Sequence, residues 1–308
     1  MIINGSASFW LGTYKGVEDI AKELNVKASV GSPTPAEHAK QVSIFRDAIA
    51  AKVAGIAISP IQADAMKTEI DSAIAAGVNV ITFDSDSSAS KRPCYLGTDN
   101  IAAGKALGEE AKKLLPNGGK LVAFVGNMGA QNAKERYQGF KEAIAGTKLE
   151  FIQEPFEDNK DQARAKKNAQ DALLKYKGQL VGLVALYGYN SPANVSALKE
   201  AGLIGKIKVI SFDGDPATLK SLTNGEVDVT VVQKPYQFGR LTVMLLNALH
   251  KSKGDLAAAI KEIQPELDKQ GMKVKNNGSI IDTGVDVLTP ANCKPFLDKL
   301  KEQGLEST

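Results

Sequence analysis

The stretch VITFD at residues 80–84 returns as VISFD at residues 209–213, and these two copies decide the fold prediction. Two further pairs keep the same order along the chain: YKGV at 14–17 matches YQGF at 137–140, and VAGIAI at 53–58 matches LVGLVA at 180–185. The three offsets are 123, 127 and 129 residues, so they nearly agree. Three ordered matches predict two similar lobes, each an open α/β sheet.

Short β-branched runs alternate with longer segments whose apolar residues have helical spacing. In residues 63–76, Met66, Ile70 and Ala73 share one helix face. The predicted strands cover residues 1–4, 53–59, 78–83, 95–97, 120–125, 180–186 and 208–212, and the predicted helices cover 63–76, 101–115, 133–145, 161–176, 193–201 and 238–249. This alternation predicts parallel sheets covered by helices on both faces.

Each copy of the repeated stretch ends in an aspartate, Asp84 in the first and Asp213 in the second. In open α/β sheets, ligands bind beyond the carboxyl ends of the strands. A single aspartate there is often only a turn residue. Two aspartates at matching positions favour a binding site, to which both lobes contribute.

The motifs of common enzyme sites are missing from the sequence. There is no G-x-G-x-x-G after the first strand, no phosphate-binding loop, no G-x-S-x-G and no H-E-x-x-H. The run beginning at Asp84 starts like a calcium loop, but Ala89 and Tyr95 stand where that loop needs glycine and glutamate. Asp84 and Asp86 could form an acid/base pair, yet no neighbouring signal supports it. A binding function is favoured over catalysis, with no cofactor and no metal.

Several other residues at predicted strand ends suit a polar ligand. Phe9 and Trp10 could stack on a sugar ring, although core packing is the alternative for them. Arg136 offers a fork of donors for hydroxyl pairs, although a solvated helix-face charge is the alternative. The remaining candidates after strands are Ser59, Tyr187, Asn190 and Gln233.

Composition narrows the class of protein further. The chain has 308 residues and a net charge of +3, which is too small and too evenly spread for a nucleic-acid or anionic-membrane surface. Residues 1–10 lack the features of an export signal, so we expect a mature or trimmed start, although a cytosolic protein would read the same way. Cys94 and Cys293 are too few for a disulfide framework or a zinc site.

Seven motifs, taken in order, resemble the type I sugar-binding periplasmic proteins of bacterial ABC transporters, the ribose-binding class. They are Phe9-Trp10, Ile58-Ser-Pro60, Ile81-Thr-Phe-Asp84, Gly97-Thr-Asp99-Asn100, Glu135-Arg136-Tyr-Gln-Gly139-Phe140, Phe212-Asp213-Gly and Val232-Gln233-Lys-Pro235. Each motif is weak alone, but the ordered set is specific and covers nearly the whole chain.

The resemblance implies two Rossmann-like lobes joined by a three-segment hinge, with crossings near residues 98–99, 233–234 and 282–285. The N-terminal lobe would hold residues 1–98 and 234–283, and the C-terminal lobe residues 99–233 and 284–308. A monosaccharide or polyol would be enclosed between the lobes by hinge closure and delivered to a membrane permease. We expect a monomer, in the periplasm or lipid-anchored outside the cytoplasmic membrane, with no nucleic-acid partner. A disulfide between Cys94 and Cys293 is not expected, because it would tie together lobes that must open.

The resemblance also carries individual residues over. Phe9 and Trp10 match an aromatic pair, Asp84 and Asp213 match hydroxyl-binding aspartates, Arg136 matches a ligand-binding arginine and Gln233 matches a glutamine at a crossing. Tyr187 takes the place of a ligand-binding asparagine, for which Asn190 is an alternative. The full set of expected ligand-binding residues is Phe9, Trp10, Ser59, Asp84, Asp86, Arg136, Tyr187, Asn190, Asp213 and Gln233.

Three positions depart from the ribose-binding pattern. Ala7 and Ser59 stand where the family has asparagines, and Ser85 stands where ribose binders have an arginine, with Asp86 next. These changes remove donors and add an acid, so ribose itself is not implied.

Two other classes of protein share the predicted fold. The effector-binding core of a LacI-like transcription regulator would need a helix-turn-helix near its start, whereas here the first predicted strand begins at residue 1. A two-lobed α/β enzyme would need a nucleophile, metal or cofactor fingerprint, and none is found.

Overall fold

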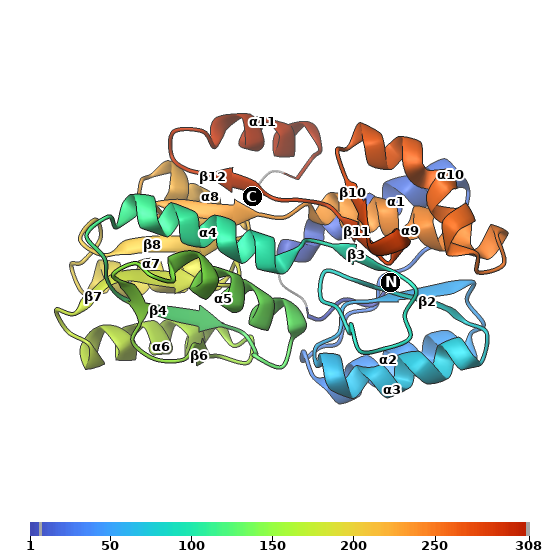
Figure 1. Ribbon diagram of the computed structural model, residues 1–308, viewed down its shortest axis with the longest axis horizontal. Helices are drawn as coiled ribbons and strands as arrows, with labels where there is room; N and C mark the ends of the chain where they lie inside the picture. Colours follow the sequence, from blue (N-terminus) through green and yellow to red (C-terminus); the bar gives the residue numbers. More distant parts are fainter. Residues whose placement is uncertain (6–7, 306–308) are drawn as a thin grey trace. The chain divides into compact units, whose positions relative to one another are not determined.

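The computed structural model describes residues 1–5 and 8–305, which form two α/β units (Figure 1). Unit 1 comprises Met1–Asp99, Gly129–Asn132 and Lys234–Gly284, and unit 2 comprises Asn100–Met128, Ala133–Gln233 and the chain from Val285 onward. Three main segments therefore link the units, at residues 99–100, 233–234 and 284–285. The predicted α/β fold with two Rossmann-like units is confirmed.

Unit 1 has a five-stranded sheet in the order β1-β2-β3-β11-β10. Its elements are the 3-10 helices η1 (Ser8–Trp10) and η2 (Asn276–Gly278), the strands β1 (Gly55–Ile58), β2 (Asn79–Phe83), β3 (Tyr95–Gly97), β10 (Lys273–Lys275) and β11 (Ile280–Asp282), and the helices α1 (Leu11–Leu24), α2 (His38–Ala50), α3 (Ala63–Ala75), α9 (Pro235–Lys251) and α10 (Leu256–Lys269). All pairings in this sheet are parallel except that of the edge strand β10 with β11.

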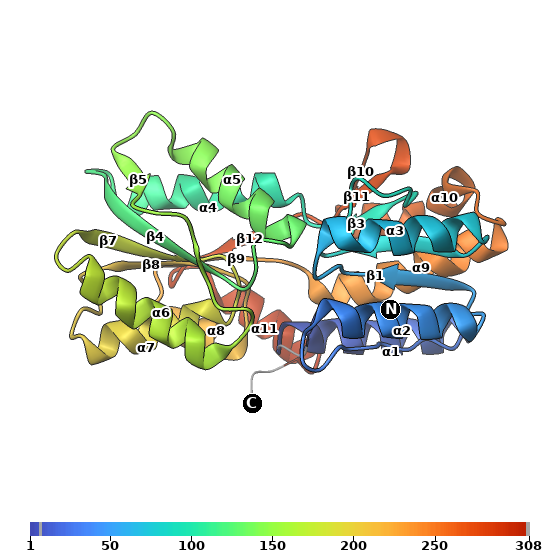
Figure 2. The same cartoon turned by 90° about the horizontal axis from the view of Figure 1, so that it is seen from below.

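Unit 2 has a sheet in the order β12-β9-β8-β7-β4-β5, with β6 also paired to β4. Its elements are the strands β4 (Gly119–Val125), β5 (Leu149–Phe151), β6 (Phe156–Glu157), β7 (Leu180–Ala185), β8 (Lys208–Phe212), β9 (Val229–Val232) and β12 (Asp286–Leu288), and the helices α4 (Asn100–Leu114), α5 (Gln131–Ile144), α6 (Gln162–Lys175), α7 (Asn190–Glu200), α8 (Pro216–Thr223) and α11 (Lys294–Glu302). Only β12 is antiparallel to its neighbour, β9. Figure 2 shows α4 and α5 on one face of this sheet and α6, α7 and α8 on the other.

The core of unit 1 follows from strands buried on both faces. Along β1, Ile56 and Ile58 pack with Phe45 of α2 and Met66 of α3, whereas Ala57 packs on the opposite face with apolar residues of α9 and α10. Successive side chains of a strand point to opposite faces, so a continuous apolar run fills both layers of core.

The sequence repeat at Gly16 and Gly139 marks one packing arrangement used in both units. A Cβ atom on Gly16 of α1 would lie 2.1 Å from the backbone oxygen of Tyr236 in α9, and one on Gly139 of α5 would lie 2.1 Å from that of Ile101 in α4. Only glycine permits such close backbone approach. Each repeated motif therefore supplies the contact point of a tightly packed helix pair.

The predicted strand over residues 1–4 is wrong in extent. Only Ile2 forms bridges, to Gly31 and to Ile58. The N–H of Ile2 donates to the backbone oxygen of Ala57, and the N–H of Ile3 donates to that of Gly31. Each neighbouring segment is therefore paired over a single residue, which is too short a pairing to form a strand.

Two of the three main segments that leave unit 1 are linked by one lysine. Nζ of Lys275 lies 3.0 Å from Asp99 and 2.8 Å from Asp282, which stand at the ends of two linking segments. Asp282 also accepts from the backbone N–H groups of Asp99 and Gly284.

Within the described ranges, the helices are all too short or too polar to cross a membrane.

Candidate ligand-binding site

Polar side chains gather at the carboxyl edge of the unit 1 sheet, around Asp84. Asp84 directly follows β2 and is 3% exposed. Its Oδ2 accepts from Oγ of Ser59 at 2.7 Å and from Nδ2 of Asn4 at 3.3 Å, and Asn4 also donates to Ser59 at 3.0 Å. Two neutral donors, Asn4 and Ser59, thus orient the Asp84 carboxylate. Sequence reasoning missed Asn4, although its place at the end of the first predicted strand was a usable signal.

Asp213 occupies the same position in unit 2, at the end of β8. Asp84 has φ 57° and Asp213 has φ 66°, both in the left-handed region that Asp and Asn tolerate better than most residues. The N–H of Asp84 donates to Leu96 and that of Asp213 donates to Val231, in each case on the adjacent strand. The sequence repeat therefore reproduces a backbone turn as well as a residue type.

The aromatic pair lies near this edge of unit 1. Trp10 is 2% exposed and its ring meets Phe83 edge-on, with centroids 5.8 Å apart. Phe9 is partly buried and meets Trp10 edge-on at 4.9 Å. Trp10 is therefore a core-packing residue, as the alternative interpretation of the sequence had it. Phe9 is more exposed to solvent than Trp10. The departure at Ala7 falls outside the described residues.

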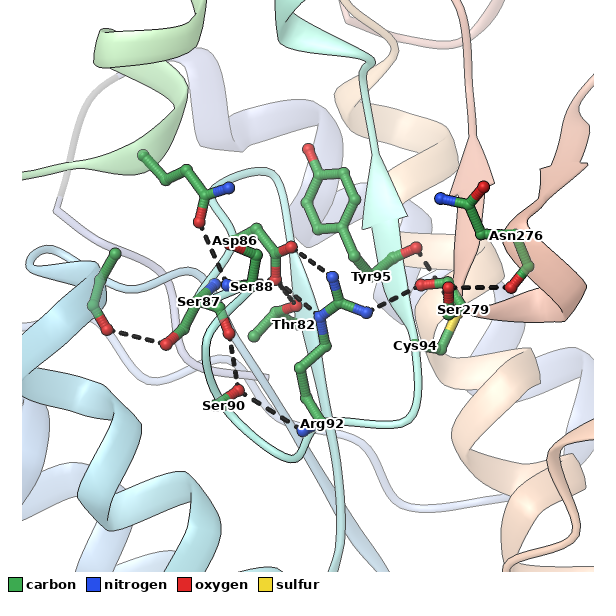
Figure 3. A network of polar contacts seen from close by, with 12 residues as sticks. Thr82, Asp86, Ser87, Ser88, Ser90, Arg92, Cys94, Tyr95, Asn276 and Ser279 are labelled. Atoms are coloured by element: carbon green, nitrogen blue, oxygen red, sulfur yellow. Dashed lines mark hydrogen bonds and ion pairs between the residues drawn. The ribbon is translucent and has the colours of Figure 1, made fainter.

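Asp86 lies two residues beyond Asp84, but its carboxylate is engaged by Arg92 (Figure 3). Both side chains are nearly buried, with exposed fractions of 8% and 9%. The structure therefore does not bring Asp86 together with Asn4 and Ser59.

In unit 2, Arg136 on α5 is buried beneath the carboxyl edge of the sheet. Its side chain is 2% exposed, so the alternative interpretation of a solvated helix-face charge is wrong. Nε donates to Asn100 at 3.0 Å and Nη1 donates to the backbone oxygen of Leu186 at 3.0 Å. The guanidinium stacks over the ring of Phe212 at 4.1 Å, which fixes its plane.

Asp213 and Gln233 extend this group. Nη1 of Arg136 lies 3.8 Å from Oδ2 of Asp213, and Nε2 of Gln233 donates to Oδ1 of Asp213 at 2.8 Å. Gln233 follows β9 directly, so it shares the sheet edge with Asp213. The aspartate therefore lies between the Arg136 cation and the Gln233 amide.

Asn190 belongs to a second buried group, centred on Asp158. Asp158 accepts from the hydroxyl of Tyr189 at 2.7 Å and from Nδ2 of Asn190 at 2.6 Å. Burial raises the pKa of the Asp158 carboxyl above its ordinary 3.8, and these two hydrogen bonds offset only part of that rise. Tyr187 lies beside Tyr189 with centroids 6.3 Å apart and flanks Arg136 at 5.6 Å. Sequence reasoning missed Asp158, because the strand before it, β6, has only two residues.

Six buried side-chain polar atoms of unit 2 have no hydrogen-bond partner within residues 1–5 and 8–305, and three of them belong to expected ligand-binding residues: Nη2 of Arg136, Oδ1 of Asn190 and Oε1 of Gln233. Buried polar groups normally find partners, so these atoms are available to a bound molecule or to water. One is a donor and two are acceptors. This mixture matches hydroxyl groups, which both donate and accept.

In the described part of the chain, no three His, Cys, Asp or Glu side chains cluster as metal ligands. Cys94 and Cys293 are both buried free thiols, one in each unit. Burial raises the pKa of Cys94 to about 12, so this thiol is not a nucleophile at neutral pH.

Known proteins resemble this chain along most of its length. The ribose import binding protein of Bacillus subtilis is 28% identical over 234 residues, covering 76% of this chain and 74% of that protein. The D-allose-binding periplasmic protein of Escherichia coli is 27% identical over 259 residues, covering 80% and 82%. A solute-binding protein of an ABC transporter from Burkholderia graminis, solved in complex with D-arabinose, is 28% identical with a TM-score of 0.83 and 94% coverage of both chains.

A family model described as the periplasmic binding protein domain matches residues 1–254. That match spans most of unit 1, including Asp84, and nearly all of the unit 2 strands with Asp213 and Gln233 at their ends. The resemblance inferred from the seven sequence motifs is confirmed: the chain belongs to the periplasmic binding protein family.

Proposed function

We propose that this protein is the sugar-binding component of an ABC importer, which binds a neutral monosaccharide or polyol and delivers it to a membrane permease. The observation that carries the proposal is the set of buried, unpartnered atoms on Arg136 and Gln233, which flank the Asp213 carboxylate, and on Asn190, which is held by Asp158. Hydroxyl groups satisfy donors and acceptors together, whereas a carboxylate or phosphate would satisfy only the arginine. The similarity to ribose-, allose- and arabinose-binding proteins supports the same class of ligand.

The proposed ligand contacts lie at the carboxyl edges of both sheets. On unit 1, Asp84 accepts ligand hydroxyls with support from Ser59 and Asn4, and Phe9 offers an aromatic wall with Trp10 packed behind it. On unit 2, the contacts are Arg136, Tyr187, Asn190, Asp213 and Gln233. The aromatic ring of Phe9 would contact the apolar face of the sugar ring, and the polar side chains would form hydrogen bonds with its hydroxyl groups.

Enclosure of one ligand by both edges stays a prediction. A ligand that needs both sets of contacts binds the closed arrangement better and shifts the population toward it. Small-angle scattering with saturating sugar should then show a smaller radius of gyration than the ligand-free protein, and an unchanged radius would contradict closure.

The location and partners follow from the same proposal. Delivery to a permease places the protein in the periplasm or tethered outside the cytoplasmic membrane. It acts there as a monomer, with the permease as its protein partner and without catalysing a reaction on the sugar.

The first experiment is a thermal-shift screen with D-ribose, D-allose, D-arabinose, ribitol and the aldonic acids of the three sugars. A ligand at about 1,000 times its Kd stabilises the folded state by about 4 kcal/mol, which is readily measured as a rise in melting temperature. We expect neutral sugars or polyols to raise the melting temperature and the acids to have no effect. Stabilisation by the acids alone would refute the proposed ligand class, and no stabilisation by any of these compounds would count against sugar binding.

A further inference from the structure

The loop between β2 and β3 contains a buried ion pair in which two nitrogens of Arg92 donate to the two carboxylate oxygens of Asp86 (Figure 3). Oδ1 of Asp86 accepts from Oγ1 of Thr82 at 2.5 Å, from the N–H of Ser87 at 2.7 Å and from Nε of Arg92 at 2.8 Å. Oδ2 of Asp86 accepts from Nη2 of Arg92 at 2.5 Å. Nη1 of Arg92 donates to the backbone oxygen of Ser279 at 2.9 Å.

These contacts occupy the Asp86 carboxylate. A carboxylate has about four acceptor positions, and four donors already engage it. Three of these donors engage Oδ1, and the Asp86 side chain is only 8% exposed, so a ligand hydroxyl would have to compete with the Arg92 guanidinium for Oδ2. The sequence prediction that Asp86 contacts the ligand is therefore not the function that this geometry supports.

The ion pair lies two residues from Asp84 along a tightly held backbone. The Asp84 N–H donates to Leu96 at 3.2 Å, and the Asp84 backbone oxygen accepts from the hydroxyl of Tyr95 at 2.9 Å. On the far side, Oγ of Ser87 donates to the backbone oxygen of Ala63 at 2.7 Å. The left-handed turn at Asp84 is thus held by β3 on one side and by the Asp86 anchor on the other.

We propose that Arg92 is a positioning residue for the ligand-binding carboxylate. Through Asp86 it fixes the turn that presents Asp84 toward ligand hydroxyls, and neither Asp86 nor Arg92 contacts the ligand. This inference rests on the proposed sugar-binding function of Asp84. If Arg92 is removed, the Asp86 carboxylate loses its cation, the loop moves to rehydrate that carboxylate, and the Asp84 turn moves with it.

The fixed end of the anchor lies in the chain segment before β11. Ser279 accepts from Arg92 and also from the N–H of Tyr95, so Arg92 and Tyr95 grip the same backbone oxygen. A shift of Arg92 would therefore disturb Asp84 from two directions, through Asp86 and through Tyr95. A lysine at this position would keep the charge but could not bridge Asp86 and Ser279 with a planar fork.

The test compares Arg92→Met, Asp86→Asn and the double variant with the wild type. Arg46→Met is the matched control, because Arg46 also grips a carboxylate through two nitrogens, that of Glu69, but is 65% exposed in the same unit. D-ribose, D-allose and D-arabinose are titrated by calorimetry. We expect each single variant to weaken sugar binding at least tenfold, the double variant to be no weaker than the worse single variant, and the control to bind normally.

Arg92→Lys completes the series and covers the case in which Arg92→Met does not fold. We expect it to fold, with an affinity between those of the wild type and Arg92→Met. Wild-type affinity in a folded Arg92→Met variant, or in Arg92→Lys if Arg92→Met does not fold, would mean that the ion pair only stabilises the loop, and the proposal would be wrong. Multiplied losses in the double variant would mean that Asp86 touches the ligand directly, which would also overturn it.

A ligand-free measurement separates this inference from the proposed function. Amide hydrogen exchange at Asp84 and Ser87 should be faster in the Arg92 variants than in the wild type and the Arg46→Met control, because both N–H groups lie in the anchored turn. Unchanged exchange would refute the positioning role whether or not any sugar binds. Faster exchange in a chain that binds none of the three sugars would support the anchor and count against the sugar-binding proposal.

Discussion

Replacing Asp84 or Asp213 by asparagine isolates the charge of each proposed ligand contact from its backbone. Both residues have positive φ, at 57° and 66°, and asparagine accepts that conformation. Alanine at the same positions would add about 1–2 kcal/mol of backbone strain, which would confuse loss of binding with loss of stability. The asparagine variants avoid this strain; Asp84→Asn should nearly keep the melting temperature of the ligand-free protein, whereas Asp213→Asn should lower it, because the buried Arg136 loses its anionic neighbour.

The expected loss of affinity follows from the hydrogen bonds. A hydrogen bond to a charged group contributes about 1.5–3 kcal/mol and one between neutral groups about 0.5–1.5 kcal/mol, so each bond weakens by about 1 kcal/mol. A carboxylate accepting two ligand hydroxyls would lose about 2 kcal/mol, or roughly 30-fold in Kd. Asp213→Asn should cost somewhat more, because Arg136 at 3.8 Å also loses its anionic neighbour.

Calorimetric titration with the sugar that gives the largest thermal shift measures these losses. Asp161→Asn is the control, because Asp161 caps α6 from an exposed position and asparagine caps helices equally well. Wild-type affinity in both Asp84→Asn and Asp213→Asn would remove these residues from the site. A loss confined to one of them would limit the ligand contact to one unit.

Three further predictions concern the scaffold around the site. Gly16→Ala and Gly139→Ala should each lower the free energy of unfolding by about 1–3 kcal/mol in urea titrations, because the added Cβ would lie 2.1 Å from a backbone oxygen of the facing helix; an unchanged midpoint would contradict the close packing. Trp10→Ala should cost about 3–5 kcal/mol of stability, and wild-type Trp10 emission should resist acrylamide quenching. Asp158 has a raised pKa, so its native carboxyl takes up a proton at a higher pH than the unfolded one; as the pH falls from neutral toward the ordinary pKa of 3.8, the wild type should gain stability relative to Asp158→Asn, and a relative loss would contradict the raised pKa.

The regular elements could be predicted where the apolar pattern was long or strongly periodic. The predicted strands at 95–97 and 208–212 have the observed bounds, and the helix predicted over 63–76 spans Ala63–Ala75. β10 and β12 were not predicted, because charged side chains interrupt their short apolar pattern, unlike that of the equally short strand at 95–97. Such short strands form only because neighbouring strands offer free edges, which is information that a local pattern does not contain.

The site was predictable to the extent that it follows strand ends. That rule identified Asp84, Asp213 and Gln233, which the structure places at the carboxyl edges of the two sheets. It could not show that Asp86 turns away to Arg92, because their pairing depends on how the loop returns to β3. For the same reason, burial of Arg136 against Phe212 could not be read from an arginine on a polar helix face.

The ion pairs of Lys275 limit how the linking segments can move. Asp99 and Asp282 share one ammonium group, and Asp282 also holds the N–H groups of Asp99 and Gly284. Two of the three linking segments are thereby joined into a single mechanical element at the boundary of unit 1. Sliding one past the other would break several charged contacts at once, whereas rotation about bonds beyond residues 99 and 284 breaks none of them. The segments at residues 99–100 and 284–285 should therefore move together, whereas the third main segment, at residues 233–234, is not held by Lys275 in the described contacts.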